Sequence, residues 1–340
     1  MNLPSLFKPN SSNNDVLNGS QVWTKPVCIT LLLLVISMVV FIVFKSHGNW
    51  AFVLELRGKK LLALMVVGYA LGVSTLLFQT LTQNPILTPS LLGFDALYIL
   101  IQSIIVFFLG TINIFNTQPV LKFAIEVAIM MGASLLLFRL LFTRNHHDLA
   151  RLILVGIIFG VLFRSLSSLV ARLISPEDYV VVQASSFAQF NTINLDLLVV
   201  SLVVCLFSAI VLWRWRYQMD ILMLGREAAI NLGINYQQFS LKLLVLIAIL
   251  VATATAFVGP VVFLGLLVCA ITNRICRRMY HSERLVLVSL VAMLCLVLGQ
   301  TVFEQILGLT GVLSAVIEVC GGLLFLVLIF TQYRRNIKMA

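Results

Sequence analysis

Long apolar segments alternate with short polar connections along most of this chain. Segments of about 20 apolar residues, enough for a helix to cross a lipid core of about 30 Å, recur between residues 27 and 330. The short alternating segments of a membrane β-barrel are absent from the sequence. The pattern predicts an all-α polytopic membrane protein with about ten transmembrane helices, at residues 27–44, 61–81, 91–110, 121–142, 152–173, 195–213, 241–257, 260–276, 285–302 and 312–330.

One apolar stretch tests this division into spans. Residues 243–273 contain no charged side chain, and as a single helix they would be about 46 Å long. That length is too great for one span and too small for two ordinary spans. Gly259-Pro260 lies near the middle, where proline interrupts helical hydrogen bonding. We therefore predict a tight hairpin of two short helices.

Composition supports the membrane assignment, and charge orients the chain. Charged residues make up 11% of the sequence, about half the share usual in a soluble domain. With ten spans both termini lie on one side, and most of the 23 Lys and Arg residues fall there. Basic residues favour the cytoplasmic side, so we expect cytoplasmic termini. Topology and contact with anionic membrane lipid then explain the net charge of +10 without a nucleic-acid partner.

We divide the chain into a cytoplasmic N-terminal segment (1–26), a transmembrane domain (27–330) and a cytoplasmic C-terminal tail (331–340). The sequence lacks the G-x-x-x-x-G-K-[ST] loop that cradles ATP phosphates, and it lacks the H-E-x-x-H and G-x-S-x-G motifs. Its six cysteines show no metal or redox spacing. We expect a transport subunit without a metal or cofactor of its own, not an enzyme. Any ATP hydrolysis must come from another subunit.

Two polar segments interrupt the apolar pattern. Between the second and third predicted spans, residues 82–90 contain glutamine, asparagine and two prolines, which predicts a hinge. In the segment 214–240, apolar residues recur at helical spacing, and Gly225 and Gly233 bracket a short helix of about two turns. Such an amphipathic helix either packs into a groove on a partner protein or lies on lipid. Its periodicity leaves both alternatives open.

Four collinear motifs resemble those of the permeases that import vitamin B12, haem and ferric siderophores through ABC transporters. GREAAINLG (225–233) resembles the family's G-x-E-x-A-x-x-L-G element. Residues 79–93 follow its Q-x(4)-N-P-x(3)-P-x-x-L-G pattern. Gly259-Pro260 with 263–266 resembles G-x-I-x-F-V-G-L, and Arg57 with Lys60 resembles L-R-x-P-R. Together these motifs cover roughly 55–330.

The resemblance implies a type II ABC importer permease in the bacterial cytoplasmic membrane. Two permease subunits would enclose a path, two ATPases holding ATP and Mg²⁺ would bind below, and a siderophore-binding protein would dock outside. The short helix would be the coupling element, carried by Leu224, Gly225, Arg226, Glu227, Ala228, Ala229, Leu232 and Gly233. The docking residues would be Arg57, Lys59 and Lys60, which could alternatively contact lipid headgroups. The translocation path and hinge would include Gln79, Asn84, Pro85, Pro89, Gly93, Asp95, Gly259, Pro260 and Gly265.

The sequence also departs from the family pattern. Phe94–Tyr98 replace the usual small residues after Leu-Gly, Cys269-Ala270 replace Pro-His, and Glu283-Arg284 replace a later His-Arg. These changes resemble permeases that pair with a second, different permease, so we expect a heterodimer rather than a homodimer. Import of haem or vitamin B12 is an alternative within the family.

Several polar residues fall inside the predicted spans and leave a rival function open. Asp95, Glu126 and Glu318 could serve a secondary transporter driven by an ion gradient. Asp95 could instead lie on the import path or cap the third span, and we favour the cap. We expect Glu318 to pair with an interior polar group and Glu304 to lie near the outer mouth.

Overall fold

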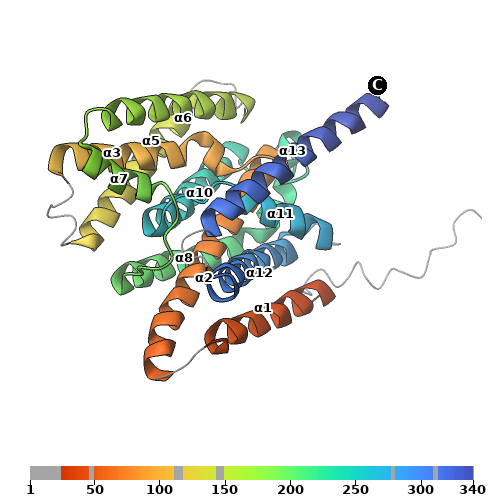
Figure 1. Ribbon diagram of the computed structural model, residues 1–340. Coiled ribbons are helices and arrows are strands. Elements are labelled where there is room, and N and C mark those ends of the chain that lie inside the picture. The colour runs from red at the N-terminus through yellow and green to blue at the C-terminus, as the bar shows by residue number, and fades with distance from the viewer. Residues whose placement is uncertain are drawn as a thin grey trace, which may run out of the picture.

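The computed structural model describes residues 24–45, 50–110, 118–142, 149–276, 280–308 and 313–339, and within these ranges all regular structure is helical. Most of the predicted N-terminal segment, residues 1–23, lies outside the described residues. In chain order (Figure 1) the elements are α1 (Lys25–Val43), α2 (Trp50–Thr82), η2 (Pro89–Leu92), α3 (Phe94–Leu109), α5 (Pro119–Phe142), α6 (Leu149–Ala171), α7 (Pro176–Ser185), α8 (Leu195–Leu222), α9 (Arg226–Asn231), α10 (Tyr236–Val258), α11 (Leu264–Ile275), α12 (His281–Gln300), η3 (Thr301–Ile306) and α13 (Leu313–Met339).

The helices confirm the predicted all-α membrane architecture. Among the described residues, seven helices are long and apolar enough to cross a membrane, and three shorter apolar helices accompany them. Each of these ten corresponds to one predicted span. The stretch 243–273 is indeed broken, because α10 ends at Val258 and α11 begins at Leu264. The chain is therefore a multi-pass membrane protein.

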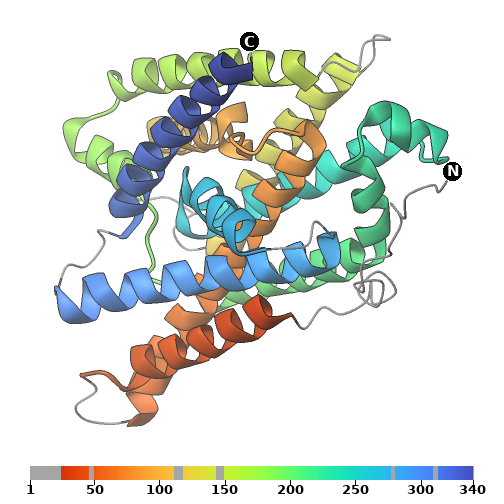
Figure 2. The ribbon, with the colours of Figure 1, turned by 90° about the vertical axis from the view of Figure 1, so that its right-hand side faces the viewer.

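Successive spans run back and forth between two ends of the molecule. We call them the α9 end, which holds the short helix α9, and the α7 end, which holds helix α7. Figure 2 shows α9 on the right and α7 on the left, with α1 and α12 lying side by side between the two ends. The 82–93 connection lies at the α9 end. The end of α1, the start of α2 and the 258–264 connection lie at the α7 end.

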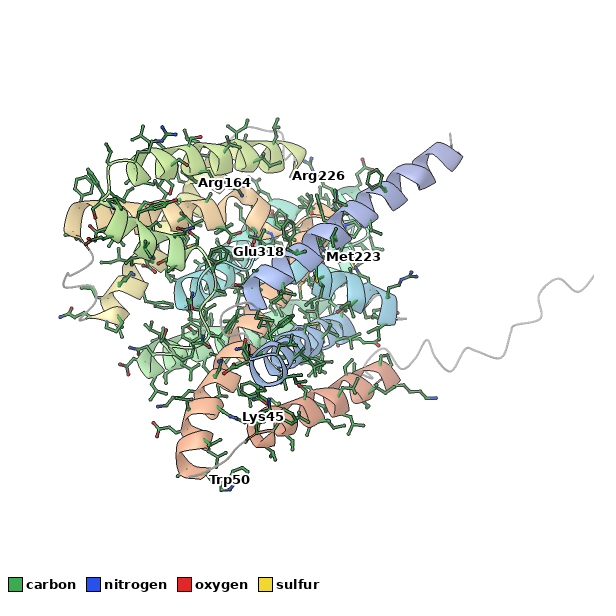
Figure 3. The ribbon with its side chains drawn as sticks, in the orientation of Figure 1. Lys45, Trp50, Arg164, Met223, Arg226 and Glu318 are labelled. Carbon is green, nitrogen blue, oxygen red and sulfur yellow. The ribbon has the colours of Figure 1, made fainter. Side chains whose placement is uncertain are left out.

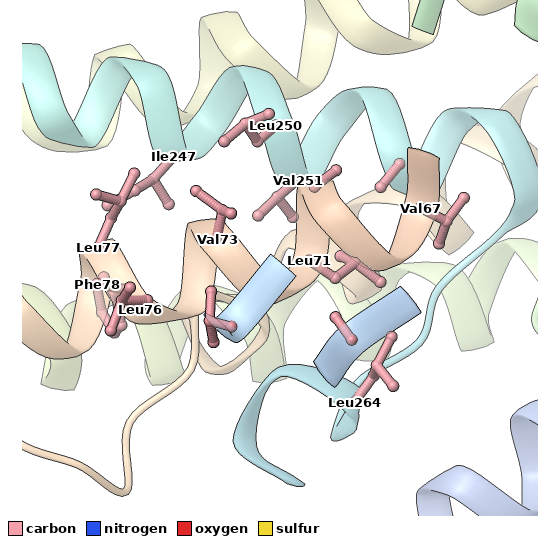
Figure 4. Packing of buried hydrophobic residues seen from close by; sticks show 14 of the residues in the cluster. Val67, Leu71, Val73, Leu76, Leu77, Phe78, Ile247, Leu250, Val251 and Leu264 are labelled. Carbon is pink, nitrogen blue, oxygen red and sulfur yellow. The ribbon is translucent and has the colours of Figure 1, made fainter. Parts of the chain in front are cut away.

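Helix α2 forms the centre of the packing. Within its apolar window 83% of the residues are buried, and it contacts α8, α10, α11 and α12. Figure 4 shows Val73 and Leu77 of α2 facing Val251 and Ile247 of α10. On another face, glycines allow α12 to approach closely: a Cβ on Gly68 would lie 3.1 Å from the backbone of Ala292.

Three elements differ from the prediction. Helix α7 lies in a segment that we treated as a connection, although Ser175, Pro176 and an acidic first turn form a recognisable start signal. Helix α8 continues through residues 214–222, which we had assigned to the coupling segment, because no glycine or proline interrupts it before Gly225. Helix α13 continues through the predicted tail to Met339.

Candidate functional site

The connection between α2 and α3 is held by its own side chains. Gln79 Nε2 donates a hydrogen bond to the carbonyl oxygen of Pro85 at 2.8 Å. Asn84 Oδ1 accepts from the backbone nitrogen of Ile86 at 3.0 Å, which closes a local turn. Gln83, with φ of +51°, adopts a left-handed conformation directly after α2. The polar residues read from the sequence therefore shape the connection itself.

Gly93 anchors this connection to α6. It caps the N-terminus of α3 with φ of +88°, and a Cβ at this position would lie 2.7 Å from the Cα of Gly160. One turn earlier on α6, a Cβ on Gly156 would lie 3.0 Å from the Cα of Leu92. Gly156 and Gly160 form a small-x-x-x-small pair, a recognised signal for close helix packing that our sequence analysis missed.

The short helix α9 matches its predicted form. Gly225 and Gly233 flank it with φ of +100° and +84°, which explains why glycine stands at both positions. Ala229 is buried, whereas the remaining predicted coupling residues are exposed or half-buried. Leu224, Leu232 and the helix's own Ile230 are all exposed large apolar side chains. Helix α9 thus presents apolar surface that its own chain does not cover.

Gln83 joins the hinge to the base of α9. Its Nε2 lies 3.4 Å from the carbonyl oxygen of Leu222, the last residue of α8. A Cβ on Gly225 would lie 3.6 Å from the same Nε2 atom. Because Gln83 contacts this joint, a displacement of the residues between α8 and α9 would also move the α2–α3 connection.

A buried histidine ties three helices together beside this joint. Asp220 Oδ1 on α8 accepts from both the backbone nitrogen and Nδ1 of His281 on α12, at 2.7 and 2.8 Å. The other ring nitrogen, Nε2, lies 2.9 Å from Thr80 Oγ1 on α2. His281 is fully buried. No sequence pattern could reveal this cluster, because its members lie 61 and 201 positions apart.

Arg284 extends the polar contacts from α12 to α11. It donates to Asn273 Oδ1 at 2.7 Å, and its other terminal nitrogen lies 3.3 Å from Met223 Sδ. In the sequence, Glu283-Arg284 stand out only as a departure from the family pattern. Gln79, Asn84, Pro85 and Arg284 all line a cavity of about 240 Å³ at this end.

The predicted docking residues lie at the α7 end, where two of them make internal contacts. Arg57 Nη1 donates to the carbonyl oxygens of Phe41, Ile42 and Phe44, at 3.1, 2.9 and 2.7 Å, and so caps the C-terminus of α1.

Lys60 is buried, pairs with Glu304 and donates to Asn191 Oδ1 at 2.7 Å. Glu304 thus lies at the α7 end, and its place on the outer side of the membrane stays a prediction. Lys59 pairs only with Glu55, at 2.5 Å, and stays partly exposed. Docking remains a prediction, with Lys59 as the member that is bonded to no other helix among the described residues.

The remaining predicted path residues form a separate group. Gly259 ends α10 with φ of +104° and precedes Pro260, and a Cβ there would lie 3.0 Å from the carbonyl oxygen of Phe187. A Cβ on Gly265 would lie 1.9 Å from Thr75 Oγ1 of α2. The structure therefore does not place these residues together with the 79–95 group at the α9 end.

The intramembrane carboxylates have different environments. Glu126 is buried and accepts from Gln102 Nε2 at 2.6 Å. Asp95 stands in the first turn of α3, where a carboxylate suits the helix dipole as expected. It makes no capping hydrogen bond, because Gly93 occupies the N-cap position. Asp95 Oδ2 is buried without a hydrogen-bond partner. Among the described residues Glu318 has no partner either, contrary to our expectation.

No group of three or more His, Cys, Asp or Glu residues that could hold a metal ion exists within the described part of the chain. The candidate site therefore consists of the α2–α3 hinge, the exposed helix α9 and the buried hydrogen bonds beside them.

Comparisons with known proteins agree with this architecture. The FecCD transport family matches residues 23–331. The petrobactin import system permease protein YclO of Bacillus subtilis strain 168 is 40% identical over 85% of this chain and 92% of its own length. FatC of Bacillus anthracis, named a petrobactin import system permease protein, is 29% identical over 82% and 79%. An inward-facing metal-chelate type ABC transporter structure superposes with a TM-score of 0.78 and 22% identity, covering 90% of this chain and 98% of its own.

Proposed function

The chain belongs to the FecCD transport family, and on this premise we propose that it is the permease subunit of an ATP-driven importer for a ferric siderophore. The observation that carries the proposal is the exposed helix α9, bracketed by two positive-φ glycines and linked through Gln83 to the α2–α3 hinge. Two relatives named for petrobactin import support a ferric chelate as substrate. Haem and vitamin B12 remain the alternatives, since relatives are named for each.

The geometry supports a lever mechanism. Helix α9 would sit in a groove of the ATPase, so that closure of two ATPases around ATP and Mg²⁺ pushes the α8–α9 joint. Gln83 would pass this movement to the hinge, and the contact of Gly93 with Gly160 would pass it to α6. Tilting of α3 and α6 would then open the path to one side and close it to the other. Rigid elements packed this closely switch between discrete arrangements.

As a permease of an importer family, the chain works with ATPase and binding-protein subunits. We propose further that its permease partner is a different chain, that both termini are cytoplasmic and that no cofactor is bound. The binding protein would dock at the α7 end. Because Arg57 and Lys60 make internal bonds there, a charge reversal at Lys59 tests docking with the least structural damage.

An ion-driven secondary transporter is the second candidate, and the carboxylates argue against it. Such a transporter gathers its coupling groups at one broken-helix site near the membrane midplane. Here Glu126 is bonded to Gln102, and Glu318 stands on α13, as Figure 3 shows. Among the described residues, the one ion pair that any of these three carboxylates makes is that of Glu126 with Lys122. Asp95 interacts electrostatically with Glu318 and Arg164, but Glu126 does not join them.

The test is uptake by the assembled importer. The permease is purified with its ATPase and partner subunits, placed in proteoliposomes and supplied with binding protein loaded with ⁵⁵Fe-labelled ferric petrobactin. We expect uptake that needs both ATP and the binding protein. Uptake that persists with a catalytically inactive ATPase, or that follows an imposed ion gradient, would overturn the proposal.

A further inference from the structure

Helix α6 carries an arginine where a membrane helix should be apolar. Arg164 stands about two turns before α6 ends, inside one of the seven candidate spans. Only 17% of that span is buried within its own chain, and Arg164 itself is exposed. A charge in this position is costly in lipid, so it must face water or another polar group.

Arg164 does not stand alone on this face. Ser168 follows four residues later on the same side of the helix, with Ser165 beside them. Arg172 comes directly after the end of α6 and lines the same cavity as these three residues. Two cavities of about 290 and 540 Å³ adjoin here, and both are lined by Arg164 and Ser168. Tyr179 and Gln183 of α7 complete the smaller cavity. We call residues 164, 165, 168 and 172 the α6 arginine face.

The guanidinium groups of this face are unsatisfied. Among the described residues, neither Arg164 nor Arg172 has a side-chain hydrogen bond or ion pair. Arg164 is electrostatically attracted to Asp95, but no contact within 4 Å joins them. By contrast, Arg57 and Arg284, at the ends of spans, are bonded within the chain. Arg57 and Arg284 thus donate hydrogen bonds within the chain, whereas the described residues provide no acceptor for Arg164 or Arg172.

We propose that the α6 arginine face lines the import path and contacts the anionic oxygens of the ferric chelate during its passage. Guanidinium groups recognise carboxylate and catecholate oxygens through paired, charge-assisted hydrogen bonds. The neighbouring serine, tyrosine and glutamine side chains add neutral donors to the same cavities. The substrate class is therefore an anionic, oxygen-rich chelate rather than an apolar one. The inference rests on the proposed function.

The experiment measures uptake of ⁵⁵Fe-labelled ferric petrobactin per ATP hydrolysed in proteoliposomes that contain the complete importer. Arg164→Gln and Arg172→Gln each remove one charge, Arg164→Lys keeps it, and Arg214→Gln removes an exposed charge from α8 as the matched control. We expect the two Gln variants to lower uptake per ATP about tenfold, the loss typical of one charge-assisted hydrogen bond. Arg164→Lys should recover part of the uptake, and Arg214→Gln should match the wild type.

Three results would overturn the inference. If a Gln variant fails to assemble with its partners, the arginine forms an ion pair with a carboxylate of another subunit instead. A defect that vanishes when anionic lipid is left out of the vesicles would assign it to lipid phosphate. Unchanged uptake per ATP in both Gln variants would also exclude the contact. If the wild type itself took up no ferric chelate, the proposed function would fail, which separates the two hypotheses.

Discussion

A single buried histidine joins three helices that are far apart in the sequence. His281 on α12 uses its backbone nitrogen and Nδ1 toward Asp220 of α8, and its Nε2 toward Thr80 of α2. Because an ionised carboxylate only accepts hydrogen bonds, Nδ1 is assigned as the ring nitrogen that carries a proton. Asp220 stands five positions before Gly225, so the histidine fixes the helix end from which α9 departs.

Replacing Asp220 by Ala should therefore destabilise the protein. The change leaves a buried backbone donor and a buried imidazole nitrogen without an acceptor, which costs about 1–3 kcal/mol. Asp196→Ala, an exposed aspartate in the first turn of the same helix, is the matched control. The measurement is the free energy of unfolding of the detergent-purified permease. Equal losses in the two variants would refute a bridging role for Asp220.

At the level of elements, the contact between η2 and α6 depends on glycines. Gly156 lies under Leu92 and Gly160 lies under Gly93, so the hinge rests directly on the α6 backbone. Gly132, on α5, is equally helical, but a Cβ there would meet nothing within 4 Å. A glycine-to-alanine substitution can therefore be compared at two helical positions, one against Leu92 and one without a neighbouring atom.

Gly156→Ala should destabilise the protein by about 1–3 kcal/mol, because the added methyl group overpacks against Leu92. Gly132→Ala should be neutral or stabilising by up to about 1 kcal/mol, since alanine favours helix more than glycine does. Thermal unfolding compares the two variants, and ATP-driven uptake reports whether the hinge still moves. A Gly156→Ala protein as stable and as active as Gly132→Ala would contradict the tight contact.

The same elements indicate what a sequence can predict. The spans, the break at Gly259-Pro260 and the short helix α9 follow from local periodicity and from glycine and proline, so they were predicted. Helix α7 was missed because its ten residues are too short to register as an apolar span. The His281 cluster and the Arg57 cap were missed because they join distant positions. Such contacts depend on the packing of α2, which a linear pattern does not contain.

Across the whole molecule, the two ends have different chemistry. At the α7 end, Arg57 and Lys60 bind other parts of the chain and hold α1, α2 and η3 together. At the α9 end, the apolar residues Leu224, Ile230 and Leu232 remain exposed, and Gln83 of the hinge contacts the end of α8 that leads into α9. The basic residues Arg57 and Lys60 are thus bonded within the chain, whereas the apolar residues around α9 remain available to a partner surface.

Leu232 distinguishes the two alternatives for that surface, an ATPase groove and lipid. If an ATPase groove receives α9, Leu232→Asp places a charge in an apolar contact and forfeits about 1.5–3 kcal/mol of burial. The ATPase retained by the permease in detergent should then fall at least about tenfold, since 1.4 kcal/mol corresponds to a factor of ten. Gln237→Glu, an exposed position in the first turn of α10, adds the same charge nearby and should retain the ATPase. If α9 instead lay on lipid, both variants would bind the ATPase equally in detergent, where no bilayer is present. Only the groove explains a loss confined to Leu232→Asp, because the charge is then harmful only where a protein surface covers it.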